Sequence, residues 1–188
     1  AEVVATAAEE RPATVAGQTR ALIDGIVPSD TYASSFDSTS QSQIESVLDT
    51  LQALADHDPQ TVRGDLRYLL ESMLDGGYEL DFETPHYSVS SGVQRLAEQT
   101  STLRTECIET LRRAIETGTE TRKLTALSLL IDVCDSSDDP AFRTECAAVL
   151  ADTLISSAPP PTPVDDSGRN CRRVAAAGLA SLADFGGE

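Results

Sequence analysis

The sequence predicts an all-α protein built from repeated pairs of helices. Alternating β-branched runs that are typical of strands do not occur, whereas apolar residues recur at helical spacing along almost the whole chain. Four segments also align with one another, and they begin in the same way at Val15, Val62, Leu103 and Phe142. These starting points lie roughly 40 residues apart, a period that indicates a repeat of helical units.

Each aligned segment is expected to form the second helix of a pair. Apolar or small residues follow each starting point at positions +4, +7 or +8, and +11 or +12, which places them on one face of a helix. Pro59 and Pro140 stand where two of these helices should begin, because the fixed φ of proline suits the first helical turn. Asp58 and Asp139 precede them as expected N-caps.

A shorter apolar-periodic segment precedes each second helix, so the chain divides into helix pairs. We expect a single domain over residues 1–188, and the pattern leaves open that it belongs to a longer protein. The expected units cover residues 1–27, 41–75, 91–117 and 120–156, followed by an unpaired terminal helix over residues 168–185.

The local sequence LADHDPQTVRGDLRYLL resembles a HEAT repeat, with a first helix, an Asp-Pro turn and Val-Arg opening the second helix. The sequence DDPAFRTECAAVL follows it with one residue deleted. This HEAT/armadillo resemblance implies an α-solenoid of about four helix pairs plus the terminal helix. It also implies a structural ladder of arginines, which Arg63, Arg104 and Arg143 would form; Ala16 departs from it in the first unit.

Two of the four cysteines stand in a repeated RTEC string. Cys107 and Cys146 occupy the +4 position that Leu66 holds in the second unit, so a buried, inert thiol is expected there. Glu106 and Glu145 precede them, near helix N-termini where the helix dipole stabilises an acid.

No catalytic or metal-binding constellation is evident in the sequence, and no cofactor is expected. His57 and His86 are the two histidines, and neither has a second His or Cys at metal-binding spacing. The acidic run DVCDSSDDP lacks the glycine and the final glutamate of a calcium loop.

The charge balance is strongly acidic, with 31 Asp and Glu against 14 Lys and Arg and a formal net charge of −17. This disfavours nucleic acid as a partner, because phosphate binding needs clustered basic residues. Lys123 is the only lysine, and an acidic, lysine-poor composition resembles that of halophilic proteins. No apolar run reaches the length of a membrane span, and a cytoplasmic location is expected.

Two surfaces are candidate partner-binding sites. Long polar insertions are expected after three of the second helices. The first two are rich in amphipathic rings that give contact area at low entropic cost. The alternative is that these rings fold inward and hold their own loops. The second surface is the inner one lined by the second helices, at the positions that point outward from each helix. The candidate residues are Tyr32, Phe36, Tyr78, Phe82, His86, Tyr87, Arg67, Tyr68, Arg112 and Arg113.

The HEAT resemblance and the lack of a catalytic motif lead us to expect a non-catalytic scaffold or adaptor that binds another protein. One alternative is an enzyme on a HEAT-like frame, of the lyase or DNA glycosylase type. Another is a self-assembling subunit, because the terminal segment VAAAGLASLA has a small apolar face that would need a continuation, a partner or a second copy.

Overall fold

The computed structural model describes residues 15, 17–26, 38–75, 87–156 and 171–184. In these residues the chain forms eight α-helices and no strands, which confirms the all-α prediction for this part of the protein. In chain order, the helices are α3 (Thr19–Ile26), α4 (Ser38–Ala55), α5 (Pro59–Asp75), α6 (Tyr87–Gln99), α7 (Ser101–Thr117), α8 (Glu120–Asp135), α9 (Pro140–Ser156) and α10 (Cys171–Asp184).

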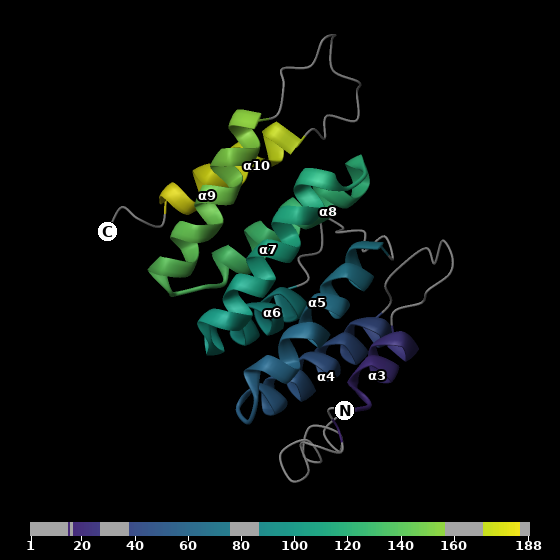
Figure 1. The fold of residues 1–188 in the computed structure, drawn as a ribbon. Coiled ribbons are helices and arrows are strands. Elements are labelled where there is room, and N and C mark those ends of the chain that lie inside the picture. The colour runs from purple at the N-terminus through teal and green to yellow at the C-terminus, as the bar shows by residue number, and fades with distance from the viewer. Residues whose placement is uncertain (1–14, 16, 27–37, 76–86, 157–170, 185–188) are drawn as a thin grey trace.

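The helices follow one another along the molecule in chain order, from α3 at one end to α9 and α10 at the other (Figure 1). Each helix packs against the next helix but one: α3, α5, α7 and α9 contact one another in sequence, and so do α4, α6, α8 and α10. We call these two sets the odd row and the even row. Contacts between consecutive helices, such as α4 with α5 and α8 with α9, join the two rows.

Capping residues account for where several helices begin. Asp58 Oδ1 accepts hydrogen bonds from the backbone N–H groups of Gln60 (3.0 Å) and Thr61 (3.4 Å), and α5 begins at Pro59. Asp139 caps α9 in the same way, so both predicted N-caps are confirmed. Threonines do the same for α7 and α8, although the sequence analysis did not single them out.

One predicted boundary is wrong. Tyr87 was expected in an insertion, with the following helix beginning near residue 91, but α6 begins at Tyr87 itself. The helix extends one turn further toward the N-terminus because no proline or glycine separates Tyr87 from Ser91. Pro85 lies just before this start, where a helix can tolerate it.

The core lies between the two rows and is filled by the periodic apolar positions. Val62, Leu103 and Phe142 are completely buried, and so are Leu66, Cys107 and Cys146 at the +4 position. Removing such side chains from water is the main stabilising contribution to packing of this kind. The expectation that Cys107 and Cys146 occupy a buried leucine position is therefore confirmed.

Glycines allow helices of the even row to approach closely at two places, Gly92 of α6 against Leu48 of α4 and Gly178 of α10 against Ile131 of α8. A Cβ atom added to Gly178 of α10 would lie 2.6 Å from both Cγ1 and Cδ1 of Ile131 in α8. Any side chain at this position would therefore force α10 away from α8 or displace Ile131.

No helix in the described part of the chain is long and apolar enough to cross a lipid bilayer.

Candidate functional site

The structure describes four of the residues predicted to bind a partner together with their surroundings. These are Arg67 and Tyr68 on α5, and Arg112 and Arg113 on α7, all in the odd row. Tyr87 is the first residue of α6. The other candidates lie outside the described residues: Tyr32, Phe36, Tyr78, Phe82 and His86.

Tyr68 is part of a polar contact between α5 and α3. Its hydroxyl donates a hydrogen bond to the Asp24 carboxylate, which raises the pKa of the Tyr68 phenol. The guanidinium of Arg20 lies over the same ring, 5.5 Å from its centre, in a cation–π arrangement. Tyr68 therefore joins neighbouring helices of the odd row while part of its ring stays accessible.

Arg67 shares a buried carboxylate with Arg63. The Nε atoms of both arginines donate to Glu106 on α7, one to each carboxylate oxygen. The Glu106 side chain is only 3 % exposed. Burial alone would raise the pKa of Glu106, but the hydrogen bonds and charges of Arg67 and Arg63 outweigh it and lower that pKa. Glu106 therefore stays ionised inside the junction between α5 and α7.

An equivalent pairing joins α3 to α5. Arg20 Nε lies 3.4 Å from Oδ1 of Asp65, which holds the same position in its unit as Glu106 does in the next. Here one arginine, 67 % exposed, faces the carboxylate. Burial raises the pKa of Asp65 more than Arg20 lowers it, so the contact between α3 and α5 is electrostatically weaker than that between α5 and α7.

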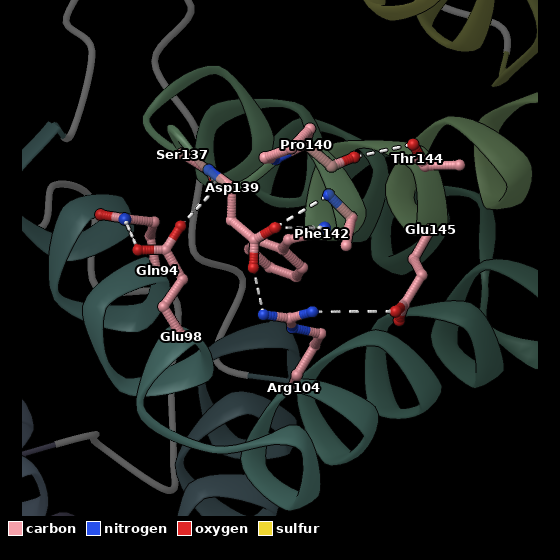
Figure 2. A network of polar contacts seen from close by, with 10 residues as sticks. Gln94, Glu98, Arg104, Ser137, Asp139, Pro140, Phe142, Thr144 and Glu145 are labelled. Atoms are coloured by element: carbon pink, nitrogen blue, oxygen red, sulfur yellow. Dashed lines mark hydrogen bonds and ion pairs between the residues drawn. The ribbon is translucent and has the colours of Figure 1, made fainter.

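Arg104 forms the corresponding contact between α7 and α9 (Figure 2). It donates to the Asp139 carboxylate, lies 4.0 Å from a carboxylate oxygen of Glu145, and stands 5.6 Å from the centre of the Phe142 ring. Asp139 also accepts the N–H groups that cap α9, so one carboxylate serves both the cap and the ion pair. These bonds lower the pKa of Asp139, the backbone bond from Ala141 contributing most.

The same network extends to α6 through the turn before α9 (Figure 2). Ser137 donates its hydroxyl proton to Glu98 and accepts the N–H of Asp139 at 3.1 Å. Glu98 also receives a hydrogen bond from Gln94. Ser137 is 1 % exposed, so a substrate cannot reach its hydroxyl. The network therefore holds the turn in place and does not form a nucleophile site.

Arg143 lies in the first turn of α9, half-buried, and its carbonyl oxygen is 4.0 Å from the Sγ atom of Cys134. Its assignment to an arginine ladder stays a prediction.

The side chains of Arg112 and Arg113 contact different acidic residues. Arg113 is 55 % exposed and lies 3.7 Å from Glu71 on α5, whereas Arg112 lies 3.9 Å from Glu109 in its own helix. Arg112 also lines a cavity of about 370 Å³ between α7, α8, α9 and the start of α10. The other charged residues of that cavity are Glu116, Lys123 and Asp152.

Groups that could hold a metal ion are not assembled in the described residues. No cluster of three or more His, Cys, Asp or Glu in this part of the chain has an arrangement that could hold a metal ion. His57 is exposed in the turn between α4 and α5, and His86 lies outside the described residues. Burial raises the pKa of the Cys107 thiol to about 12, as expected for an inert cysteine.

Sequence reasoning missed several of these contacts. Glu106 was interpreted as an acid near a helix N-terminus, not as the partner of two arginines. Arg20 and Asp24 were not singled out, although both join α3 to α5. A usable signal was present, because Asp65, Glu106 and Glu145 share the +3 position of their units. An acid repeated at that position indicates a basic partner on the preceding unit.

No protein-family model matches the chain, and no curated protein or solved structure matches it either.

Proposed function

We propose that this protein is a non-catalytic protein–protein interaction scaffold, built as an α-solenoid of HEAT-like helix pairs. The observation that carries the proposal is the two-row contact pattern, in which each helix packs against the next but one along the chain. Repeat proteins are stacked in this way, since each unit contacts mainly its neighbours. They work through extended surfaces, and such a surface suits a protein partner.

The ion pairs of the odd row give independent support for a repeat. In each of the three junctions the acid at +3 faces an arginine of the preceding odd-row helix: Asp65 faces Arg20, Glu106 faces Arg63 and Arg67, and Glu145 faces Arg104. Equivalent positions that make equivalent contacts are what a repeated unit produces. We therefore assign Arg63 and Arg104 to a structural ladder, and we expect Arg143 to continue it.

We place the binding edge where the odd-row helices end and the even-row helices begin. The connections α3 to α4, α5 to α6 and α9 to α10 are long, whereas the turns from α4 to α5, α6 to α7 and α8 to α9 are short. Tyr32, Phe36, Tyr78 and Phe82 lie in two of the long connections, and Tyr87 directly follows one of them. Aromatic residues are enriched at interfaces because they supply rigid contact area.

Affinity capture with two matched variants tests this proposal. The bait is the wild-type protein in a high-salt lysate of the source organism, which suits the acidic composition. A variant with Tyr78, Phe82 and Tyr87 changed to alanine should lose the captured partner. A control variant with His57→Ala and Asp138→Ala, two exposed residues on short turns, should retain it. Equal capture by both variants would contradict the binding edge.

Self-assembly is the second candidate, and an exposed apolar residue favours it. Ile155, in the last turn of α9, is 81 % exposed. Exposed alanines lie at positions 176, 177 and 180 of α10, the helix that packs against α9. Sedimentation velocity separates the two candidates: association that Ile155→Glu abolishes favours assembly, and a monomer at high concentration favours the scaffold.

A further inference from the structure

The cavity between α7, α8, α9 and the start of α10 has the size and the lining of a small-molecule site. Its volume is about 370 Å³, and sites for small organic ligands measure roughly 300–1,000 Å³. Ile115 of α7 and Val149 of α9 give it an apolar wall, and they are 6 % and 2 % exposed. Arg112 and Lys123 add positive charge to the same cavity. Apolar walls with a few polar groups are typical of sites that hold an organic molecule.

The uncharged polar groups of the cavity already have hydrogen-bond partners. The hydroxyl of Thr153 donates to the carbonyl oxygen of Val149 at 2.8 Å. The hydroxyl of Ser156 donates to the carbonyl oxygen of Asp152 at 2.7 Å. The Sγ atom of Cys171 lies 3.7 Å from a carboxylate oxygen at the start of α8. The protons of these three groups are therefore not available to a ligand.

Two cationic groups remain as donors among the described residues that line the cavity. The Nε atom of Arg112 is buried and has no hydrogen-bond partner in the described part of the chain. Lys123 is half-buried and forms no ion pair with any described carboxylate. A buried donor without an acceptor is costly, and a negatively charged acceptor forms the strongest hydrogen bonds with such donors. The cavity is therefore suited to a ligand that carries an anionic acceptor.

The two acids of the cavity restrict the charge of that ligand. Glu116 and Asp152 are exposed, so water screens them, whereas the two cations are half-buried. One negative charge is balanced by the cations, but a ligand with several negative charges would be repelled by the acids. The apolar wall favours a ligand with a hydrocarbon part, which inorganic anions lack.

We propose that this cavity binds a small organic carboxylate with a short hydrocarbon part. The carboxylate accepts from Arg112 Nε and from the ammonium group of Lys123, and the hydrocarbon part packs against Ile115 and Val149. The site lies within the junction between α7 and α9 and needs no protein partner. It therefore stands or falls independently of the scaffold proposal.

The test follows the amide NMR spectrum of the purified protein during titration with sodium hexanoate at constant ionic strength. Hexanoate should bind saturably, and the largest shifts should centre on the amides of Ile115, Val149 and Thr153. Hexanol has the same hydrocarbon chain without the charge, and inorganic phosphate has charge without the chain. Each should bind at least about tenfold more weakly than hexanoate.

Substitutions separate the two cations from the rest of the surface. Lys123→Ala and Arg112→Ala should each weaken hexanoate binding by about tenfold. Arg95→Ala is the matched control, since Arg95 lies on α6, is 54 % exposed and faces Asp49 at 3.5 Å. It should leave hexanoate binding unchanged.

Four results would overturn the proposal. The first is the absence of saturable hexanoate binding, and the second is binding with shifts that centre outside the cavity. The third is equal affinity for hexanoate and for hexanol or phosphate. The fourth is unchanged hexanoate binding by both Lys123→Ala and Arg112→Ala. The first three come from the wild type and do not depend on whether the substituted variants fold.

Discussion

The buried acid Glu106 pairs with two arginines of the odd row. It is 3 % exposed, yet Arg63 and Arg67 each donate to one of its oxygens. The two arginines are 46 % and 41 % exposed, so they stay partly hydrated while they neutralise the acid. Removing one partner of such a pair leaves the other charge uncompensated, and this strongly destabilises the junction.

We therefore expect Glu106→Gln to destabilise the protein by about 2 kcal/mol, because the amide cannot pair with both arginines. Urea unfolding monitored by circular dichroism gives this difference directly. The matched control is Glu109→Gln, whose carboxylate is 52 % exposed and lies 3.9 Å from Arg112, and which should cost less than about 0.5 kcal/mol. Equal effects of the two substitutions would contradict the role assigned to Glu106.

Asp132 shows the opposite electrostatic behaviour. Burial, with a smaller contribution from Asp135, raises the pKa of Asp132 to about 6. Between pH 3.8 and about 6 the folded protein then binds more protons at this site than the unfolded chain does. The contribution of Asp132 to stability falls as the pH rises through this window.

Asp132→Asn should consequently raise the free energy of unfolding by about 1–2 kcal/mol at pH 7 and have little effect near pH 4. The measurement is urea unfolding at a series of pH values. Asp152→Asn on the exposed side of α9 is the control and should shift the curve equally little at every pH. A stabilisation by Asp132→Asn that is the same at pH 4 and pH 7 would be inconsistent with this account.

For single residues, the sequence predicted which positions are buried better than it predicted which side chains are in contact. The +4 pattern predicted buried Cys107 and Cys146, because one helix face is enough to decide burial. The pairing of Glu106 with Arg63 and Arg67 was not predicted. It depends on which helix lies opposite, and periodicity within one helix carries no such information.

At the scale of the helix, Asp58 and Asp139 both cap a helix start, but their surroundings differ. Asp58 caps α5 and also accepts a hydrogen bond from the hydroxyl of Thr61. Asp139 caps α9 and in addition pairs with Arg104 of the preceding odd-row helix. Hydrogen bonds to these carboxylates lower the pKa of both, chiefly from Thr61 at Asp58 and from the Ala141 N–H at Asp139.

Replacing each cap with alanine should lower the thermal midpoint, with the shift for Asp139→Ala about twice that for Asp58→Ala because an ion pair is lost as well. Differential scanning calorimetry gives both shifts. In the Arg104→Ala background the two substitutions should become similar. Both effects should be present at neutral pH and disappear as the pH falls below 3.8 and through the lowered folded-state pKa values. A larger shift for Asp58→Ala would contradict the assigned contacts.

Helix starts were predictable where the chain has an explicit signal. Asp-Pro predicted the beginning of α5 and α9, because both residues favour the first turn for independent reasons. The start of α6 at Tyr87 was missed because the sequence from Tyr87 to Ser91 is compatible with either a loop or a helix. Packing of α6 against α4 and α7 then selects the helix.

For the whole molecule, the net charge indicates which salt concentrations favour the folded state and says little about the fold. A formal charge of −17 is spread over a chain in which most described arginines already face a carboxylate. The unpaired acids repel one another, and the compact state suffers more from this repulsion than the unfolded chain does.

Stability should therefore rise as KCl is increased from about 0.1 M to about 1 M, where the Debye length falls from ~10 Å to ~3 Å. Thermal unfolding at each concentration measures the effect, and NaCl at equal ionic strength should act in the same way if screening is its cause. A lower midpoint at high salt would indicate that the ion pairs between helices outweigh the repulsion.

At the scale of the whole molecule, the sequence predicted the positions of helices but not the partner. The alignment at Val62, Leu103 and Phe142 predicted second helices at these positions, and α5, α7 and α9 contain these residues. The identity of a partner depends on surface chemistry, and the alignment of buried positions carries no information about it.

The most direct test of the scaffold proposal is the affinity of the captured partner, once purified, for the intact protein and for the variant with Tyr78, Phe82 and Tyr87 changed to alanine. Calorimetric titration at high salt should give an affinity at least about tenfold weaker for this variant, because aromatic anchors carry much of an interface's binding energy. The His57→Ala, Asp138→Ala control should bind as the wild type does. Equal affinities for all three proteins would contradict binding through this edge.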